Sequence, residues 1–324
     1  MNHKLESLPY YIHSFKTLRR DYKKGGAPHK PVLLLSIIQL IESGVIFSNR
    51  INIIPELVGT FKSTWNALVN TGHDMIFALP FYHMQSEPFW KLSANPGCEK
   101  WIEAKGSMRS FGNLNTAVAY AEIDHELFEL LNENDSREIL KYTLLEKYFP
   151  ETKDNLIVYP DSYCSDITNE ILREGAEAYR TRIQELKNRL DKDTYQEELF
   201  VRSGIFKREV PKVYNNTCCI SGLRVDATIF VTMVDACHIV PFSISYDDTI
   251  SNGLALCPNL HRAFDRGLIT LSDDYRVQVS DSFIEDESSY SIRQFAGKEI
   301  LLPAKREWWP DEGKVGWHRE RFET

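Results

Sequence analysis

Three polar side chains in the C-terminal third of the sequence have types and positions suited to phosphodiester hydrolysis. His238 lies near the end of the strand-like run TIFVTMVDACHIV, Asn252 lies in the polar loop that follows, and His261 lies in the helix-like run PNLHRAFD. A neutral imidazole can accept a proton from water beside a scissile phosphate, so His238 is a candidate general base. The pattern therefore predicts hydrolytic chemistry within residues 218–271.

A second spacing in the same region predicts a metal site. His261 and Asp265 lie four residues apart, so both side chains would face one side of a helix. Phosphodiester hydrolysis by this route needs a divalent cation to stabilise charge on the phosphate and on the leaving oxygen, and Mg²⁺ or Mn²⁺ is expected. Asp235, on the strand that carries His238, is a further candidate ligand.

This region resembles the HNH domain of McrA-like restriction endonucleases, which folds as a ββα-metal unit. The segments CISG, ACHIVPF and NGLALCPNLHRAFDRGLI carry the resemblance, which covers about residues 200–324. It implies that His238 is the general base and that Asn252 holds the loop that orients it. It also implies that His261 binds the metal, with Asp265 as a further candidate. The alternative is that these histidines are structural or that the nuclease is inactive.

One position departs from the family pattern. Many HNH sites have Asp or His directly before the general base, as a metal ligand, and here that position holds Cys237. A thiolate is a poor Mg²⁺ ligand and suits softer ions. Asp235 could supply a carboxylate instead, but the alternation of side chains along a strand places it on the face of Cys237 and opposite His238. The first metal ligand is therefore left open.

A cluster of basic residues near the N-terminus is predicted to contact DNA. Within residues 16–30, Asp21 is the only acid, and the cluster consists of Lys16, Arg19, Arg20, Lys23, Lys24 and Lys30. Such a cluster can neutralise several phosphates. The alternative is a solvated helix end and loop. Acidic residues outnumber basic ones in residues 193–324, so DNA affinity is expected to come mainly from the first domain.

Two N-terminal segments resemble the sulfur-binding domain of restriction enzymes that recognise phosphorothioated DNA. They are KKGGAPHKPVLLL at 23–35 and LPFYHMQSEPFWKL at 79–92, and the resemblance covers roughly residues 8–150. In that family this domain precedes an HNH domain, as here. The resemblance implies a small apolar cup for sulfur beside a cation for the remaining phosphate charge. The implied residues are His29 and Lys30 on the polar side, Leu79 and Pro80 in the cup, and Tyr82 or His83 on its rim.

The sequence predicts an α+β protein in three parts. They are a mixed helical and strand DNA-reader domain at 1–150, a linker and long bridging helix at 151–194, and the HNH domain at 195–324. The bridging helix is expected over 166–192. A buried helix is expected to begin near Pro31 and to end before Gly44. In NGLALCPNLHRAFDRG, a loop is expected before a short helix.

Composition limits the class of protein. The apolar and charged content is typical of a globular protein, the net charge is −8, and no apolar run is long enough to span a bilayer. The N-terminal residues lack the apolar core of a secretory signal. Six cysteines without a CxxC pair predict buried free thiols in a reducing cytoplasm. The less favoured alternative is a structural Zn²⁺ held by Cys218, Cys219, Cys237 and Cys257.

These patterns predict a type IV restriction endonuclease that binds phosphorothioate-modified double-stranded DNA and hydrolyses a nearby phosphodiester. Its expected role is defence of the cell against phage and against modified DNA. HNH units usually cut one strand, so a homodimer is expected. The first alternative is an HNH nuclease directed at modified bases or unmodified phage DNA. Base reading would need an aromatic stack, which Trp65, Trp90 and Trp101 leave open. The second alternative is a catalytically inactive DNA-binding regulator.

Overall fold

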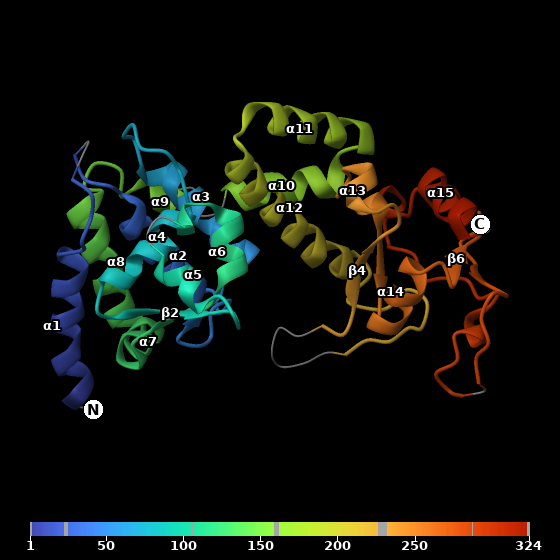
Figure 1. Cartoon of the computed structure of the whole chain (residues 1–324), viewed down its shortest axis with the longest axis horizontal. Coiled ribbons are helices and arrows are strands. Elements are labelled where there is room, and N and C mark those ends of the chain that lie inside the picture. Colours follow the sequence, from blue (N-terminus) through green and yellow to red (C-terminus); the bar gives the residue numbers. More distant parts are fainter. Residues whose placement is uncertain are drawn as a thin grey trace. The chain divides into compact units, whose positions relative to one another are not determined.

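The computed structural model describes residues 2–22, 25–104, 107–158, 162–225, 232–286 and 288–322. The chain forms two compact units (Figure 1). The first comprises Met1–Ser165 and Leu190–Val201, and the second comprises Asp166–Arg189 and Arg202–Thr324. After Arg189 the chain therefore rejoins the first unit, and it passes into the second unit again within helix α12 (Lys192–Val213).

The first unit consists of helices around a small antiparallel sheet. Strand β3 (Val118–Ile123) is central, with β1 and β2 on either side of it. The elements in chain order are α1 (Asn2–Lys16), α2 (His29–Glu42), β1 (Arg50–Ile51), α3 (Pro55–Leu68), α4 (Ala78–His83), β2 (Trp90–Ala94), α5 (Glu99–Glu103), α6 (Phe111–Ala117), β3, α7 (His125–Asn132), α8 (Asn134–Tyr148) and α9 (Asn155–Val158).

Helix α2 is the buried helix that the sequence predicts. Pro31 lies in its first turn, and most of its residues are buried. Gly44 follows the helix with a φ of +75°, a left-handed conformation that glycine adopts without a Cβ clash. Helix α2 packs against α3 and α4, so its N-terminus lies near Leu79 and Pro80 of α4.

The second unit contains a ββα arrangement. Strand β4 (Asp235–His238) pairs antiparallel with β5 (Gly253–Leu256), and helix α14 (Pro258–Asp265) packs against both. The other elements are most of α10 (Ser162–Arg173), α11 (Ala176–Arg189), the second half of α12, α13 (Phe242–Ser245), β6 (Ile269–Leu271), β7 (Val277–Val279) and α15 (Glu312–Phe322). The mixed helix and strand content predicted from the sequence is confirmed.

Two local features differ from the prediction. The helix expected over 166–192 is broken into α10 and α11, with Gly175, a poor helix former, between them. The segment GLAL, expected as a loop, is strand β5, because pairing with β4 satisfies its backbone groups while all four residues are buried. Among the residues that the structure describes, no helix has the length and apolar content needed to cross a bilayer.

Candidate active site

His238 is the last residue of β4, and the second unit fixes its ring on two sides. Its Nε2 lies 2.8 Å from Oδ1 of the buried Asp248. Phe206 of α12 stacks on the ring, with centroids 4.0 Å apart and planes 10° apart. A carboxylate oxygen accepts hydrogen bonds, so this contact fits the tautomer with the proton on Nε2, which leaves Nδ1 to accept another bond. The side chain is 21% exposed, so water can reach it.

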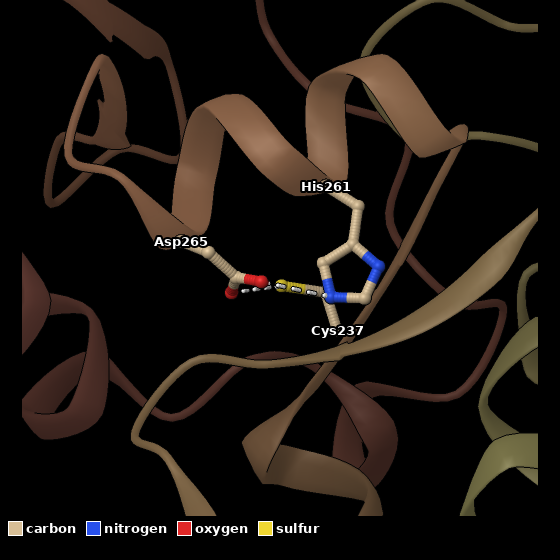
Figure 2. A group of neighbouring side chains, drawn as sticks. All are labelled: Cys237, His261 and Asp265. Atoms are coloured by element: carbon tan, nitrogen blue, oxygen red, sulfur yellow. Dashed lines mark hydrogen bonds and ion pairs between the residues drawn. The ribbon is translucent and has the colours of Figure 1, made fainter. Parts of the chain in front are cut away.

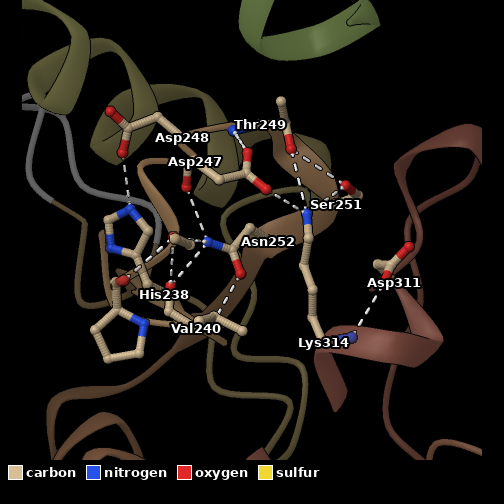
Figure 3. A network of polar contacts seen from close by, with 11 residues as sticks. His238, Val240, Asp247, Asp248, Thr249, Ser251, Asn252, Asp311 and Lys314 are labelled. Atoms are coloured by element: carbon tan, nitrogen blue, oxygen red, sulfur yellow. Dashed lines mark hydrogen bonds and ion pairs between the residues drawn. The ribbon is translucent and has the colours of Figure 1, made fainter. Parts of the chain in front are cut away.

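Asn252 is fully buried and holds the loop between β4 and β5. Its Oδ1 accepts a hydrogen bond from the Val240 N–H at 2.9 Å (Figure 3). Its Nδ2 donates to the carbonyl oxygens of Val240 and Asp247, at 2.9 and 2.8 Å. These bonds tie a residue just after His238 to the residue just before Asp248. The geometry is what a loop-holding role for Asn252 requires.

Gly253 allows helix α12 to approach the strands closely. It lies opposite His238 in the β4–β5 pair. A Cβ on Gly253 would lie 2.5 Å from Cγ2 of Val210, closer than real contacts allow. A side chain there would push α12 away, and with it Phe206, which stacks on His238. The Asn-Gly pair therefore positions both the loop and the ring of His238.

Replacing Asn252 by alanine is expected to destabilise the protein by about 2–4 kcal/mol, because it leaves the Val240 N–H and the Asp247 carbonyl unpaired in a buried place. Denaturant unfolding of the full chain measures the change. The matched control is Asn132→Ala, because the side chain of the exposed Asn132 has one described hydrogen bond, to the Phe128 carbonyl of its own helix. Equal stability of the two variants would contradict the loop-holding role.

The candidate metal-binding group lies on the other face of β4. Cys237, His261 and Asp265 each bring one ligand atom within 4.8 Å of the others (Figure 2). Nε2 of His261 lies 3.4 Å from Asp265 Oδ2, and Nδ1 lies 3.6 Å from Asp235 Oδ2. Strand alternation therefore places Asp235 and Cys237 together, facing α14 and away from His238, as the sequence predicts.

Cys237 gives this group its unusual donor. The side chain is fully buried, and its Sγ lies 3.7 Å from Asp265 Oδ1. Burial, followed by the negative charge of Asp265, raises the pKa of the Cys237 thiol well above its ordinary value. A coordinated thiol is deprotonated outright, so metal binding here would displace the thiol proton. A sulfur, nitrogen and oxygen donor set fits Zn²⁺, whereas Asp235, His261 and Asp265 without the sulfur suit Mg²⁺ or Mn²⁺.

Two further cysteines lie together beside the N-terminus of α14. The Ser221 N–H lies 3.4 Å from Cys218 Sγ, and Ser221 Oγ lies 3.9 Å from Cys257 Sγ. A side-chain hydrogen bond from Cys257 lowers the pKa of Cys218 to about 5. Neither cysteine takes part in a disulfide bond. Ser221 and Leu260 occupy the positions where CxxC pairs would place zinc ligands, so this pair lacks two of four donors.

A second candidate site lies in the first unit. It is a pocket of about 730 Å³, lined by Arg19, Arg20, Asp21, Ala27, His29, Lys30, His73, Ile76, Leu79, Pro80, His83, Ser86 and Arg109. The structure thus brings together seven residues expected in the reader: Arg19, Arg20, His29, Lys30, Leu79, Pro80 and His83. Lys23 and Lys24 lie outside the described residues.

Two expected reader residues have other partners. Lys30 Nζ lies 2.5 Å from Glu87 Oε1 and 2.7 Å from Ser86 Oγ, so its charge is already compensated. Tyr82 is buried, and its hydroxyl donates to the Ile102 carbonyl at 2.7 Å, so it lines a neighbouring pocket instead of this rim. Buried polar groups find partners within the fold, so Lys30 lines the pocket with its charge already paired, and His83, the alternative to Tyr82, is the rim candidate that lines it.

The same pocket contains residues that the sequence did not indicate. Arg109, at the end of a short 3-10 helix, and His73, in the loop before α4, line it from positions far along the chain, where a single basic residue forms no pattern. His29 Nε2 donates to the Asp74 carbonyl at 2.8 Å, so Nδ1, on the other side of the ring, takes no part in that bond. Burial lowers the pKa of His29, so the ring is neutral near pH 7. Arg109 is exposed and supplies positive charge to the pocket. None of the described contacts pairs it with an acidic residue of the pocket.

A match to one family model supports the assignment of the ββα arrangement to a nuclease domain. Residues 218–272 match the family model described as HNH endonuclease. The chain is similar to a solved structure described as "Modification dependent TagI restriction endonuclease", with 21% identity, 37% of this chain and 38% of that chain covered, and a TM-score of 0.27. It is also similar to the "Type IV phosphorothioation-dependent restriction endonuclease ScoMcrA", with 12% identity, 78% and 93% coverage, and a TM-score of 0.30.

The chain thus spans 38% of the length of the first of these structures. None of the curated proteins matches it in sequence. The family match includes β4, which carries His238, the turn just before β5, which carries Asn252, and α14, which carries His261. Residues 218–272 are therefore an HNH endonuclease domain.

Proposed function

We propose that the chain is a DNA endonuclease in which His238 is the general base and the group beside α14 binds a divalent cation. The observation that carries the proposal concerns two adjacent residues of β4. Cys237 belongs to the metal-binding group, and His238 is held by Asp248 as a base would be. Nδ1 of His238 takes a proton from the attacking water, and Asp248 stabilises the imidazolium that forms. When bound, the cation would supply stabilisation of charge on the phosphate and the leaving oxygen.

The proposed substrate is double-stranded DNA that carries phosphorothioate links, read by the pocket of the first unit. The pocket places the apolar side chains of Ile76 and Leu79 in the same cavity as Arg19 and Arg109. Sulfur is larger and less hydrated than oxygen, so an apolar wall favours it, while the charge of the link still needs cations. Since Lys30 is paired within the fold, we assign the phosphate to the arginines.

The proposed role in the cell is restriction of modified DNA, as in type IV systems, with the protein acting in the cytoplasm. One HNH domain cuts one strand, so a double-strand break would need two copies of the chain. A homodimer on DNA is therefore part of the proposal, and Mg²⁺ or Mn²⁺ is the expected activating ion.

Matched duplexes with and without phosphorothioate links test the reader. We expect the full chain to bind the modified duplex about tenfold more tightly, because an apolar contact to sulfur contributes about 1–2 kcal/mol. Leu79→Asn should remove this preference for the modified duplex and leave the affinity for unmodified DNA unchanged. Arg109→Ala should weaken binding to both duplexes and reduce the salt slope by about one.

The matched control for Arg109→Ala is Lys91→Ala, because Lys91 is an exposed cation on β2 outside the pocket. It should change neither affinity nor salt slope. Equal affinity of the wild-type chain for both duplexes would refute the sulfur assignment and favour another target for the same nuclease.

A further inference from the structure

Helix α15 contacts the loop between β4 and β5, although it lies outside the segment matched by the family model. Lys314, in the first turn of α15, has its Nζ 2.7 Å from Asp247 Oδ2 and 3.0 Å from Ser251 Oγ (Figure 3). Asp311, just before the helix, donates its N–H to the Ser251 carbonyl at 2.9 Å. Its Oδ1 accepts from the Lys314 N–H at 3.0 Å. The helix therefore contacts the loop at Asp247 and at Ser251.

The pair of Lys314 and Asp247 is buried on both sides. The side chain of Lys314 is 7% exposed and that of Asp247 is 0% exposed. The close contact is not aligned as a hydrogen bond, so Asp247 Oδ2 is held by charge alone. The other oxygen of Asp247 accepts from the Thr249 N–H at 2.8 Å and so shapes the turn. A buried ion pair is weak evidence for stability, since apolar residues of similar volume often do as well.

We propose that Lys314 is a positioning residue for the general base, acting through Asp247 on the loop that sets Asp248 against His238. Asp247 and Asp248 are adjacent and both buried, and each has a charged or polar partner of its own, Lys314 in one case and His238 in the other. Without Lys314, Asp247 would be an uncompensated buried charge. It would turn toward water and displace Asp248. The inference rests on the proposed role of His238.

The test compares Lys314→Met with Lys314→Arg in the full chain. Methionine keeps an apolar stem of similar length, and arginine keeps the charge. The matched control is Arg319→Met, because Arg319 lies in the same helix and pairs with the exposed Asp273 at 2.7 Å. Steady-state cleavage is measured well below the Tm of each variant. The probes are DNA extended by a polymerase with one α-thio nucleotide, and bis(p-nitrophenyl) phosphate, which needs no reader.

We expect Lys314→Met to lower kcat by about 10- to 100-fold with KM within about threefold, because a misplacement near 1 Å has effects of this size. Lys314→Arg should recover most of kcat, and Arg319→Met should leave kcat and KM unchanged. In an Asp248→Asn background, Lys314→Met should have no further effect on kcat, because both changes act on one contact.

Imidazole NMR gives a readout that does not depend on cleavage. The His238 Nε2–H signal of the bond to Asp248 is expected in the wild type and should be lost in Lys314→Met. The inference is overturned if Lys314→Met lowers only the Tm, if its loss of kcat multiplies with that of Asp248→Asn, or if the imidazole signal persists unchanged. A wild type that cleaves neither probe would refute the proposed function, while the imidazole signal would still decide the inference.

Discussion

Replacing His238 by alanine is expected to lower the single-turnover rate of DNA cleavage by about 10²- to 10⁴-fold, the usual contribution of a general base. Asp248 and Phe206 hold the ring and leave Nδ1 available to accept a proton. Among the described residues of this loop, no other side-chain nitrogen is held in this way. Affinity for DNA should stay within about threefold, because the arginines of the reader pocket belong to the other unit. Rapid-quench cleavage and fluorescence anisotropy measure the two quantities.

The matched control is His125→Ala. His125 is an exposed histidine of α7, and its only described partner is Glu129 of the same helix. Its loss should leave cleavage unchanged. A His238→Ala variant that cuts within tenfold of the wild type would remove this residue from the chemistry and favour a base elsewhere.

Replacing His261 by alanine is expected to abolish metal-dependent cleavage and to weaken divalent-ion binding by more than about 100-fold, since loss of an outer partner alone costs about 10- to 100-fold. His261 contacts both Asp265 and Asp235, and it belongs to both donor sets, as Asp265 does. Calorimetric titration with Mn²⁺ and Zn²⁺ measures the affinity directly. Undiminished binding of both ions to the variant would place the metal elsewhere.

Variants of Cys237 decide which donor set is used. If the thiol is a ligand, Cys237→Ala should lose affinity for Zn²⁺ more than for Mg²⁺, and Cys237→Asp should shift preference toward Mg²⁺. The matched control is Cys98→Ala, which removes a thiol in the first unit. If Cys237→Ala binds each ion as the wild type does, Asp235, His261 and Asp265 are sufficient.

The placement of the candidate metal ligands could be predicted from the sequence because their spacing is local. The four-residue spacing placed His261 and Asp265 on one side of α14, and strand alternation placed Asp235 with Cys237 and away from His238. These relations depend only on the repeat of a helix or a strand. The buried helix α2 was predictable for the same reason, from its apolar run and the residues at its ends.

The contacts that hold the base could not be predicted from local patterns. Phe206 and Lys314 reach the loop from α12 and α15, and only tertiary packing brings them there. Asp248 was visible as one of two acids in the loop, but nothing in the sequence told which of the two faces His238. The loop expected at GLAL is a strand because its partner β4 decides its conformation, and propensity over four residues is a weak signal.

The pocket of the first unit shows the same limit. A resemblance of sequence gathered Leu79, Pro80 and His29, which share one cavity. It also assigned Lys30 to the phosphate, whereas Glu87, distant in sequence, compensates that charge. Arg109 enters the cavity from a part of the chain with no basic pattern. The charge that faces a ligand is thus a property of the fold and not of the basic cluster alone.

The most direct test of the central claim is cleavage of two matched plasmids, one with phosphorothioate links and one without, by the wild type and by His238→Ala in Mg²⁺ and in Mn²⁺. Our account predicts that the wild type cuts the modified plasmid in at least one ion and that His238→Ala cuts neither. Wild-type cleavage of both plasmids at equal rates would contradict the reading of sulfur. Absence of wild-type cleavage of either plasmid in both ions would contradict the nuclease itself.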